Sequence, residues 1–211
     1  MKKRFLFAGI FLALFVLWTL FISLVDVMPI GPQGSFVGFA TINSYFHSLT
    51  GVNMTLYTVT DWLGLVPLAF CFSFAFLGLL QAIKRKSILM VDYSLLALGG
   101  FYIVIIFVYI LFENLVINYR PVLINGVLEA SYPSSTTLLT LCIMPTTIMQ
   151  LNSRIKNKTL NKITVILLAL FTFFMVIART VCGVHWLTDI IGGLLLSTGL
   201  VSMYRCISKA K

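Results

Sequence analysis

Charged residues are scarce in this chain of 211 residues: Asp, Glu, Lys and Arg make up only 10% of it, while 60% is hydrophobic. A soluble domain of this length needs far more charge to cover its surface, so the composition excludes that class. The four cysteines show no metal-ligand spacing, and we therefore expect neither a metal site nor a disulfide framework. Internal repeats, low-complexity segments and a separate soluble domain are also missing, so we expect one integral-membrane domain over residues 1–211.

What the chain has instead is hydrophobic runs long enough to cross a bilayer, for which about 20 predominantly apolar residues are needed. The run at residues 134–151 is the weakest, because Pro145 interrupts it. The run at residues 5–25 is longer than the apolar core of a signal peptide, so we expect it to be retained as a span. The predicted fold is all-α, a six-span transmembrane helical bundle. Its spans are expected at residues 5–25, 63–83, 95–112, 134–151, 163–178 and 186–204.

Basic residues give the orientation. Six spans place the clusters at residues 2–4, 84–86, 154–162 and 205–211 on one side, and the positive-inside rule makes that side cytoplasmic. Both termini are therefore expected inside the cell, in a multi-pass protein of the cell membrane. The net charge of +9 fits this topology and contact with anionic lipid, and it does not indicate nucleic-acid binding.

The longest connection, from Asp26 to about Trp62, is predicted to form an extracytoplasmic loop region between the first two spans. Turn-forming glycines and prolines alternate there with aromatic residues, which suits a segment at the lipid headgroups. We expect a short interfacial helix at Thr41–Ser48, and His47 within it is interpreted as an interfacial polar residue.

Three outward stretches carry chemistry. His185 and Asp189 are four residues apart at the start of the sixth span, where a carboxylate can fix the imidazole tautomer and leave the other nitrogen free to attack. Arg120 and Arg179 break the positive-inside rule, and a guanidinium fork suits phosphate oxygens. Ser134, Ser135 and Thr136 follow Pro133 at the start of the fourth span, where free backbone N–H groups favour an anion.

In this order and topology, the three stretches resemble the tripartite signature of the type 2 phosphatidic acid phosphatases. That family's pattern reads K-x(6)-R-P, then P-S-G-H, then S-R-x(5)-H-x(3)-D. Arg120 and Pro121 match the first part, Pro133 and Ser134 the second, and Arg179, His185 and Asp189 the third. The third part is the most specific.

The resemblance implies that His185 is a nucleophile that forms a phosphohistidine and that Asp189 orients it. It implies that Arg120 and Arg179 hold the phosphoryl oxygens, with help from Ser134, Ser135 and Thr136. It also implies a lipid phosphate or diphosphate as substrate, membrane lipids as surroundings, no metal or other cofactor, and an active site on the extracytoplasmic side.

Four positions depart from the family pattern. Glu113 stands at the place of the phosphate-binding Lys, Ser135 replaces Gly, and Ala178 replaces Ser. Thr136 replaces the His that protonates the leaving oxygen, and the pKa of a threonine hydroxyl is far too high for a general acid.

Three explanations of Thr136 follow. The substrate can have a good leaving group, as in a polyprenyl diphosphate; Glu113 can serve as the proton donor; or the protein can be a non-catalytic descendant that still binds lipid phosphate. Of these, we favour an active lipid phosphatase or diphosphatase, with the non-catalytic binding protein as the alternative.

Overall fold

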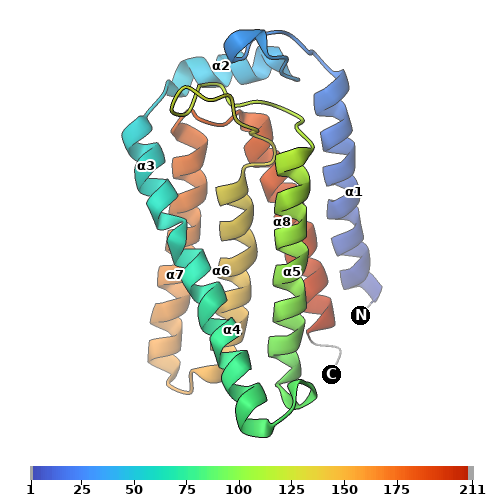
Figure 1. The fold of residues 1–211 in the computed structure, drawn as a ribbon, viewed down its shortest axis with the longest axis vertical. Helices are drawn as coiled ribbons and strands as arrows, with labels where there is room; N and C mark the ends of the chain where they lie inside the picture. Colours follow the sequence, from blue (N-terminus) through green and yellow to red (C-terminus); the bar gives the residue numbers. More distant parts are fainter. Residues whose placement is uncertain (1, 209–211) are drawn as a thin grey trace.

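Most of residues 2–208, the part of the chain that the structure describes, is α-helical in this computed structural model (Figure 1). Two short 3-10 helices and a few isolated β-bridges complete the regular secondary structure of the described residues. The α-helices are α1 (Lys2–Leu24), α2 (Ala40–Thr50), α3 (Met54–Leu63), α4 (Leu65–Arg85), α5 (Tyr93–Asn114), α6 (Ser135–Arg154), α7 (Lys158–Val181) and α8 (Leu187–Ile207).

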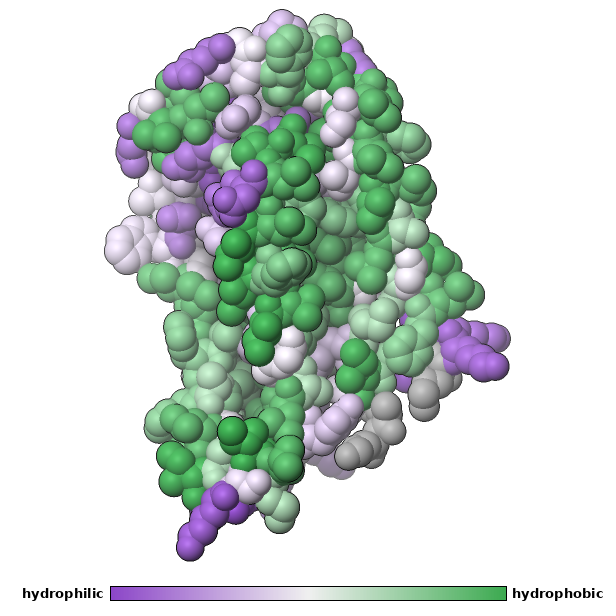
Figure 2. All heavy atoms as spheres, turned by 45° about the vertical axis from the view of Figure 1, so that its right-hand side comes forward, coloured by the Kyte–Doolittle hydropathy of each residue, from purple (hydrophilic) through white to green (hydrophobic). Residues whose placement is uncertain are grey.

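Five helical stretches are long and apolar enough to cross a membrane: α1, the continuous pair α3–α4, α5, α7 and α8. Hydrophobic residues cover most of the middle of the molecular face in Figure 2, and hydrophilic ones gather towards its two ends. The chain is therefore a multi-pass membrane protein, as its composition predicts.

Helix α6 is the one long helix that is not apolar enough to belong to this set, and the reason is its position. It packs against α4, α5, α7 and α8, so many of its side chains face protein and not lipid. Gln150 of α6 donates hydrogen bonds to the hydroxyl of Tyr204 on α8 at 2.8 Å and to the carbonyl of Ser94 on α5 at 2.9 Å. Buried polar side chains of this kind hold helices together inside a bilayer.

The first connection is shorter than the sequence predicts. We expected the extracytoplasmic loop region to extend to about Trp62, but helix α3 begins at Met54 and runs almost directly into α4. The side chain of Asn53 caps α3 by accepting from the backbone N–H of Leu56 at 2.9 Å. Pro67 lies in the first turn of α4, where a missing N–H costs no helical hydrogen bond, and it marks the boundary between the two helices.

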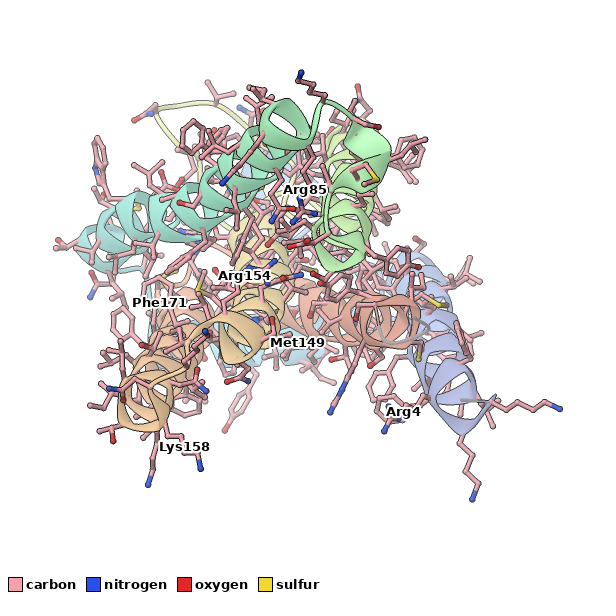
Figure 3. All side chains as sticks on the ribbon, turned by 90° about the horizontal axis from the view of Figure 1, so that it is seen from below. Arg4, Arg85, Met149, Arg154, Lys158 and Phe171 are labelled. Atoms are coloured by element: carbon pink, nitrogen blue, oxygen red, sulfur yellow. The ribbon has the colours of Figure 1, made fainter. Side chains whose placement is uncertain are left out.

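Both ends of the described chain lie at one end of the bundle, together with the α4–α5 and α6–α7 connections (Figure 1). The basic clusters follow these segments, and Figure 3 views the bundle from that end, with Arg4, Arg85, Arg154 and Lys158 labelled. Lys209 and Lys211, which complete the fourth cluster, lie outside the described residues.

At the opposite end, helix α2 lies across the tops of the long helices (Figure 1). It contains the interfacial helix expected at Thr41–Ser48. Its inner side is not simply interfacial: Asn43 donates to the Thr188 hydroxyl at 3.0 Å, and His47 Nε2 lies 3.1 Å from the carbonyl oxygen of Gly183. Helix α2 therefore holds in place the turn between α7 and α8, which carries His185.

Candidate active site

Arg120 is positioned by a short hairpin in the α5–α6 connection. Asn125 and Gly126 both adopt positive φ angles, of 51° and 78°, and form its tight turn. Antiparallel bridges on either side of that turn place Arg120 opposite Glu129, and the Arg120 Nε atom lies 3.0 Å from Glu129 Oε2. The hairpin thus folds Arg120 back over the end of the bundle, where the residue is only 8% exposed.

Arg179 lies in the last turn of α7, not in the outer turn where the sequence placed it, and it is 1% exposed. Its guanidinium donates to the hydroxyls of Thr136 at 2.8 Å and Thr60 at 3.2 Å, and stacks over the ring of Tyr57 at 4.8 Å. Asp61 is the one carboxylate among residues 2–208 within ion-pair distance, at 3.8 Å, and its side chain is 61% exposed. The positive charge of Arg179 is therefore buried with weak compensation.

His185 sits in the tight turn between α7 and α8. This turn depends on Gly183, whose φ is +71° and whose position leaves no room for a Cβ next to the carbonyl of Gly51. The imidazole is almost fully buried, and its Nε2 atom lies 3.2 Å from Arg120 Nη1. The two functional groups come from segments 65 residues apart in the sequence.

Burial is the largest cause that holds the pKa of His185 well below its ordinary value of 6.5, and the charges of Arg120 and Arg179 lower it further. The imidazole is consequently neutral at pH 7. A neutral imidazole has one nitrogen with a free lone pair, which is the form that can act as a nucleophile.

Asp189 does not contact His185 in the way that its spacing suggests. We expected the two side chains to pair on one face of a helix, but α8 begins at Leu187, so His185 lies outside it. The Asp189 carboxylate instead caps α8 by accepting from the backbone N–H of Trp186 at 2.9 Å. The distance from His185 Nδ1 to Asp189 Oδ2 is 3.9 Å, which is too long for a hydrogen bond.

Two residues that the sequence analysis did not single out complete the surroundings of Asp189. Asn118 donates to Asp189 Oδ1 at 3.3 Å, and the Ser131 hydroxyl lies 2.5 Å from Asp189 Oδ2 and 3.0 Å from His185 Nδ1. Asn118 and Ser131 face each other across the base of the hairpin, where the Ser131 N–H donates to the Asn118 carbonyl at 2.9 Å. The Asn-Gly pair at the tip is a strong hairpin signal that could have predicted the hairpin, but not the hydrogen bonds of these two side chains.

The start of α6 contributes the small hydroxyl residues. Ser135 and Thr136 face the space beside the two arginines. Ser134 is fully buried, and its hydroxyl has no hydrogen-bond partner among residues 2–208. The backbone N–H of Ser134 donates to the Asp189 carbonyl at 3.2 Å, which joins the start of α6 to the first turn of α8.

These elements enclose an open cleft of about 560 Å³ at the α2 end of the bundle. Arg120, Arg179, Ser135 and Thr136 line it, and so do the carboxylates of Asp61, Glu113 and Glu129. Glu113 also lines a water-sized cavity that borders His185 and Ser135. The cleft thus combines an anion-binding floor with an acidic rim. No three His, Cys, Asp or Glu side chains within residues 2–208 converge into a metal-binding group.

Comparisons with known proteins agree with this architecture. The whole fold is similar to the crystal structure of the first transmembrane PAP2-type phosphatidylglycerolphosphate phosphatase from Bacillus subtilis. The TM-score is 0.60 and the identity 19%, and the match covers 97% of this chain and 98% of that one. No curated protein sequence matches significantly.

The sequence model of the PAP2 superfamily matches residues 100–211, a little over half of the chain. This stretch includes Arg120, Ser134, Arg179, His185 and Asp189, the residues on which the resemblance to type 2 phosphatidic acid phosphatases rests. The motif order, the helical fold and the family model agree, and the chain belongs to the PAP2 superfamily.

Proposed function

We propose that this protein is a lipid phosphate phosphatase that hydrolyses a lipid mono- or diphosphate through a phosphohistidine intermediate on His185. The observation that carries the proposal is the contact between His185 Nε2 and the guanidinium of Arg120, which lines the same cleft as Arg179. A neutral buried imidazole next to two guanidinium groups matches the needs of a nucleophile that attacks an anionic phosphoryl group.

Arg120 and Arg179 take the non-bridging phosphoryl oxygens, which replaces weak contacts with exposed carboxylates by charge-assisted hydrogen bonds. The lone pair of His185 Nε2 then attacks phosphorus. A nitrogen–phosphorus bond forms, and the bond from phosphorus to the lipid oxygen breaks with its electron pair on that oxygen. Water next attacks phosphorus, breaks the nitrogen–phosphorus bond and releases inorganic phosphate, while the proton it loses neutralises the leaving oxygen.

The leaving group is the point at which Thr136 matters. Its hydroxyl accepts a hydrogen bond from Arg179 and cannot protonate an alkoxide. A diphosphate avoids this difficulty, because its leaving oxygen belongs to a phosphate monoester that departs as a stable anion. We therefore favour a lipid diphosphate of the polyprenyl type over a phosphatidate-like monophosphate. Glu113, which lines the cleft, is the second candidate for a proton donor.

The membrane topology forms part of the proposal. With α6 as a sixth span packed against α4, α5, α7 and α8, both termini lie in the cytoplasm and the cleft opens on the extracytoplasmic side. The support is the gathering of basic residues at the end with the termini, which the positive-inside rule makes cytoplasmic.

Phosphate release from defined lipids tests the proposal. The purified protein in detergent is given a polyprenyl diphosphate, a polyprenyl monophosphate and a phosphatidate, and inorganic phosphate is measured over time. We expect turnover, fastest with the diphosphate, and its loss by about 10³-fold or more in His185→Asn, by analogy with the removal of other catalytic nucleophiles. The folding control is the melting temperature of the variant.

The alternative function is that of a lipid-phosphate-binding protein without turnover, and the replacement of the general acid at Thr136 favours it. In this case lipid phosphates raise the melting temperature of the wild type, the effect disappears in Arg179→Gln, and no lipid releases phosphate. Turnover that persists in His185→Asn would contradict both functions as stated.

A further inference from the structure

The hydrogen bonds around His185 define the role of a residue outside the family signature. Ser131 is 3% exposed, and its hydroxyl lies between the imidazole and the carboxylate, 3.0 Å from His185 Nδ1 and 2.5 Å from Asp189 Oδ2. Since the direct distance between those two groups is 3.9 Å, every hydrogen-bonded route from Asp189 to His185 within the described residues passes through Ser131.

The direction of these hydrogen bonds follows from the number of protons available. A hydroxyl has one proton, and an ionised carboxylate only accepts, so the Ser131 proton points to Asp189. The distance of 2.5 Å is typical of an O–H donor on a charged oxygen. The Ser131 oxygen must then accept from His185, and this requires a proton on Nδ1.

The other side of the imidazole leads independently to the same tautomer. Arg120 Nη1 lies 3.2 Å from His185 Nε2, and a guanidinium has protons to donate but no lone pair to offer. Nε2 must therefore accept, which leaves it without a proton. Both contacts agree on an imidazole with Nδ1–H and an unprotonated Nε2, whose lone pair accepts from Arg120 until that guanidinium binds a phosphoryl group.

We propose that Ser131 is a positioning residue that transmits the charge of Asp189 to His185 and fixes the nucleophilic tautomer through a His–Ser–Asp chain. The inference rests on the proposed function, in which Nε2 attacks phosphorus and the ring becomes cationic. The hydrogen bond that Nδ1–H donates to the Ser131 oxygen then becomes stronger. Asp189 already holds the Ser131 hydroxyl in the orientation that accepts this hydrogen bond. Attack on phosphorus needs no proton transfer along the His–Ser–Asp chain, because the Nδ1 proton stays in place while the phosphorus–oxygen bond breaks.

Asp189 is arranged to hold this hydroxyl and not the imidazole. Three donors converge on its carboxylate: the Trp186 N–H, the Asn118 amide and the Ser131 hydroxyl. Burial of a carboxylate is costly unless hydrogen bonds compensate it, and here they also prevent rotation. Asn118 and Ser131 come from the base of one hairpin, so the loop that carries Arg120 supplies the connection as well.

The chain's two histidines make the tautomer directly measurable. We would label the full-length protein with ¹⁵N-histidine and assign the two rings from spectra of His185→Asn. In the wild type at pH 7, His185 should be neutral with its proton on Nδ1. In Ser131→Ala, the Nε2–H form should gain population, because Nδ1 has lost its acceptor and only the Arg120 contact still favours the Nδ1–H form.

Kinetics supply the second readout. Ser131→Ala should lower kcat by about 10²-fold, in the range of orienting groups of catalytic histidines, with KM changed less than about threefold. Ser131→Thr keeps the hydroxyl and should recover a large part of kcat. Ser197→Ala is the matched control: Ser197 is also buried, at 2% exposure, but its hydroxyl bonds the Leu194 carbonyl inside α8.

The outcomes separate the two ideas. If the wild type releases no phosphate from any lipid, the proposed function is wrong. The tautomer of His185 still tests whether the His–Ser–Asp hydrogen-bond chain exists. A wild-type His185 protonated on Nε2 overturns the inference even if the variants fail to fold. So does an active enzyme in which Ser131→Ala keeps kcat within about threefold of the wild type.

Discussion

Thr136 is the residue at which this chain departs most from its family, and its surroundings explain how the site tolerates the change. Its hydroxyl accepts from Arg179 at 2.8 Å, so it helps to hold the guanidinium that we propose binds phosphate, even though it cannot donate a proton to an alkoxide. Thr136 borders the cleft and is 9% exposed, so a larger side chain here can reach the substrate.

We therefore expect Thr136→His to restore a general acid. Hydrolysis of a lipid monophosphate should rise by about 10²–10⁴-fold, the usual contribution of such a group. Hydrolysis of a diphosphate should rise much less, because its leaving group needs little protonation. Rates of phosphate release from the two lipids measure this, with Thr136→Gln as a polar control that cannot donate an acidic proton. An equal gain on both lipids would argue against leaving-group protonation as the limiting step.

The buried position of His185 has a consequence for pH. Protonation removes the lone pair of the nucleophile, so activity falls as pH drops through the pKa of His185 in the folded protein. Burial first, and Arg120 and Arg179 second, lower that pKa well below 6.5. We expect the acidic limb of kcat/KM, which reports groups of the free enzyme, to have its midpoint below pH 6.5. A kcat/KM that is half-maximal at pH 6.5 or above would indicate a histidine with an ordinary pKa and would contradict this expectation.

Sequence spacing located most of the residues at the site but not the hydrogen bonds between them. Arg120, Arg179, Ser135, Thr136 and Glu113 do line one cleft, as their place in the topology suggested. The expected pairing of His185 with Asp189 failed because helical spacing holds only inside a helix, and α8 begins after His185. Ser131 escaped notice because a single serine in a loop carries no periodic signal.

At the scale of elements, α6 shows why hydropathy alone gives an incomplete account of the bundle. Its buried residues include Thr136, Thr137, Thr140, Thr146, Thr147 and Gln150. Hydropathy measures a preference for lipid, but a helix surrounded by other helices needs only satisfied or small polar groups. The outer, lipid-facing helices were predicted well from composition, whereas the inner helix was the weakest of the six runs for this physical reason.

The turn between α7 and α8 is the element on which the position of His185 depends. Gly183 has a φ of +71°, and an added Cβ would lie 1.7 Å from the Gly51 carbonyl oxygen, a backbone atom that cannot move freely. Gly183→Ala should therefore displace the turn, lower the stability by about 1–3 kcal/mol and reduce phosphate release more than tenfold.

Gly100→Ala is the matched control, since a Cβ at this position in α5 has open space around it. Alanine favours a helix over glycine by about 1 kcal/mol, so the melting temperature should stay the same or rise. Thermal unfolding in detergent and phosphate release, measured side by side, compare the two variants. If Gly183→Ala retained full activity, the turn would not be needed to place His185.

For the whole molecule, the separation of charges along the bundle axis is the feature on which the proposed orientation rests. Basic side chains gather at the end with the termini, while the cleft with its carboxylates lies at the α2 end. Anionic lipids of the cytoplasmic leaflet attract Lys and Arg at about 1 kcal/mol for each residue near the surface. Arg120 and Arg179 are the two basic residues outside the four clusters, and both line the cleft. Their place at the cleft explains why they lie away from the other basic residues.

This arrangement predicts opposite labelling of the two ends by a membrane-impermeant maleimide. Ser48 in α2 and Lys158 at the start of α7 are both exposed, and they lie at opposite ends of the bundle. In intact cells Ser48→Cys should react and Lys158→Cys should not, whereas both should react after the membrane is opened. The wild type is the background control, because Cys142, Cys182 and Cys206 are buried and Cys71 is partly buried. The reverse pattern would place the cleft in the cytoplasm, where a lipid diphosphate would have to be supplied by the inner leaflet.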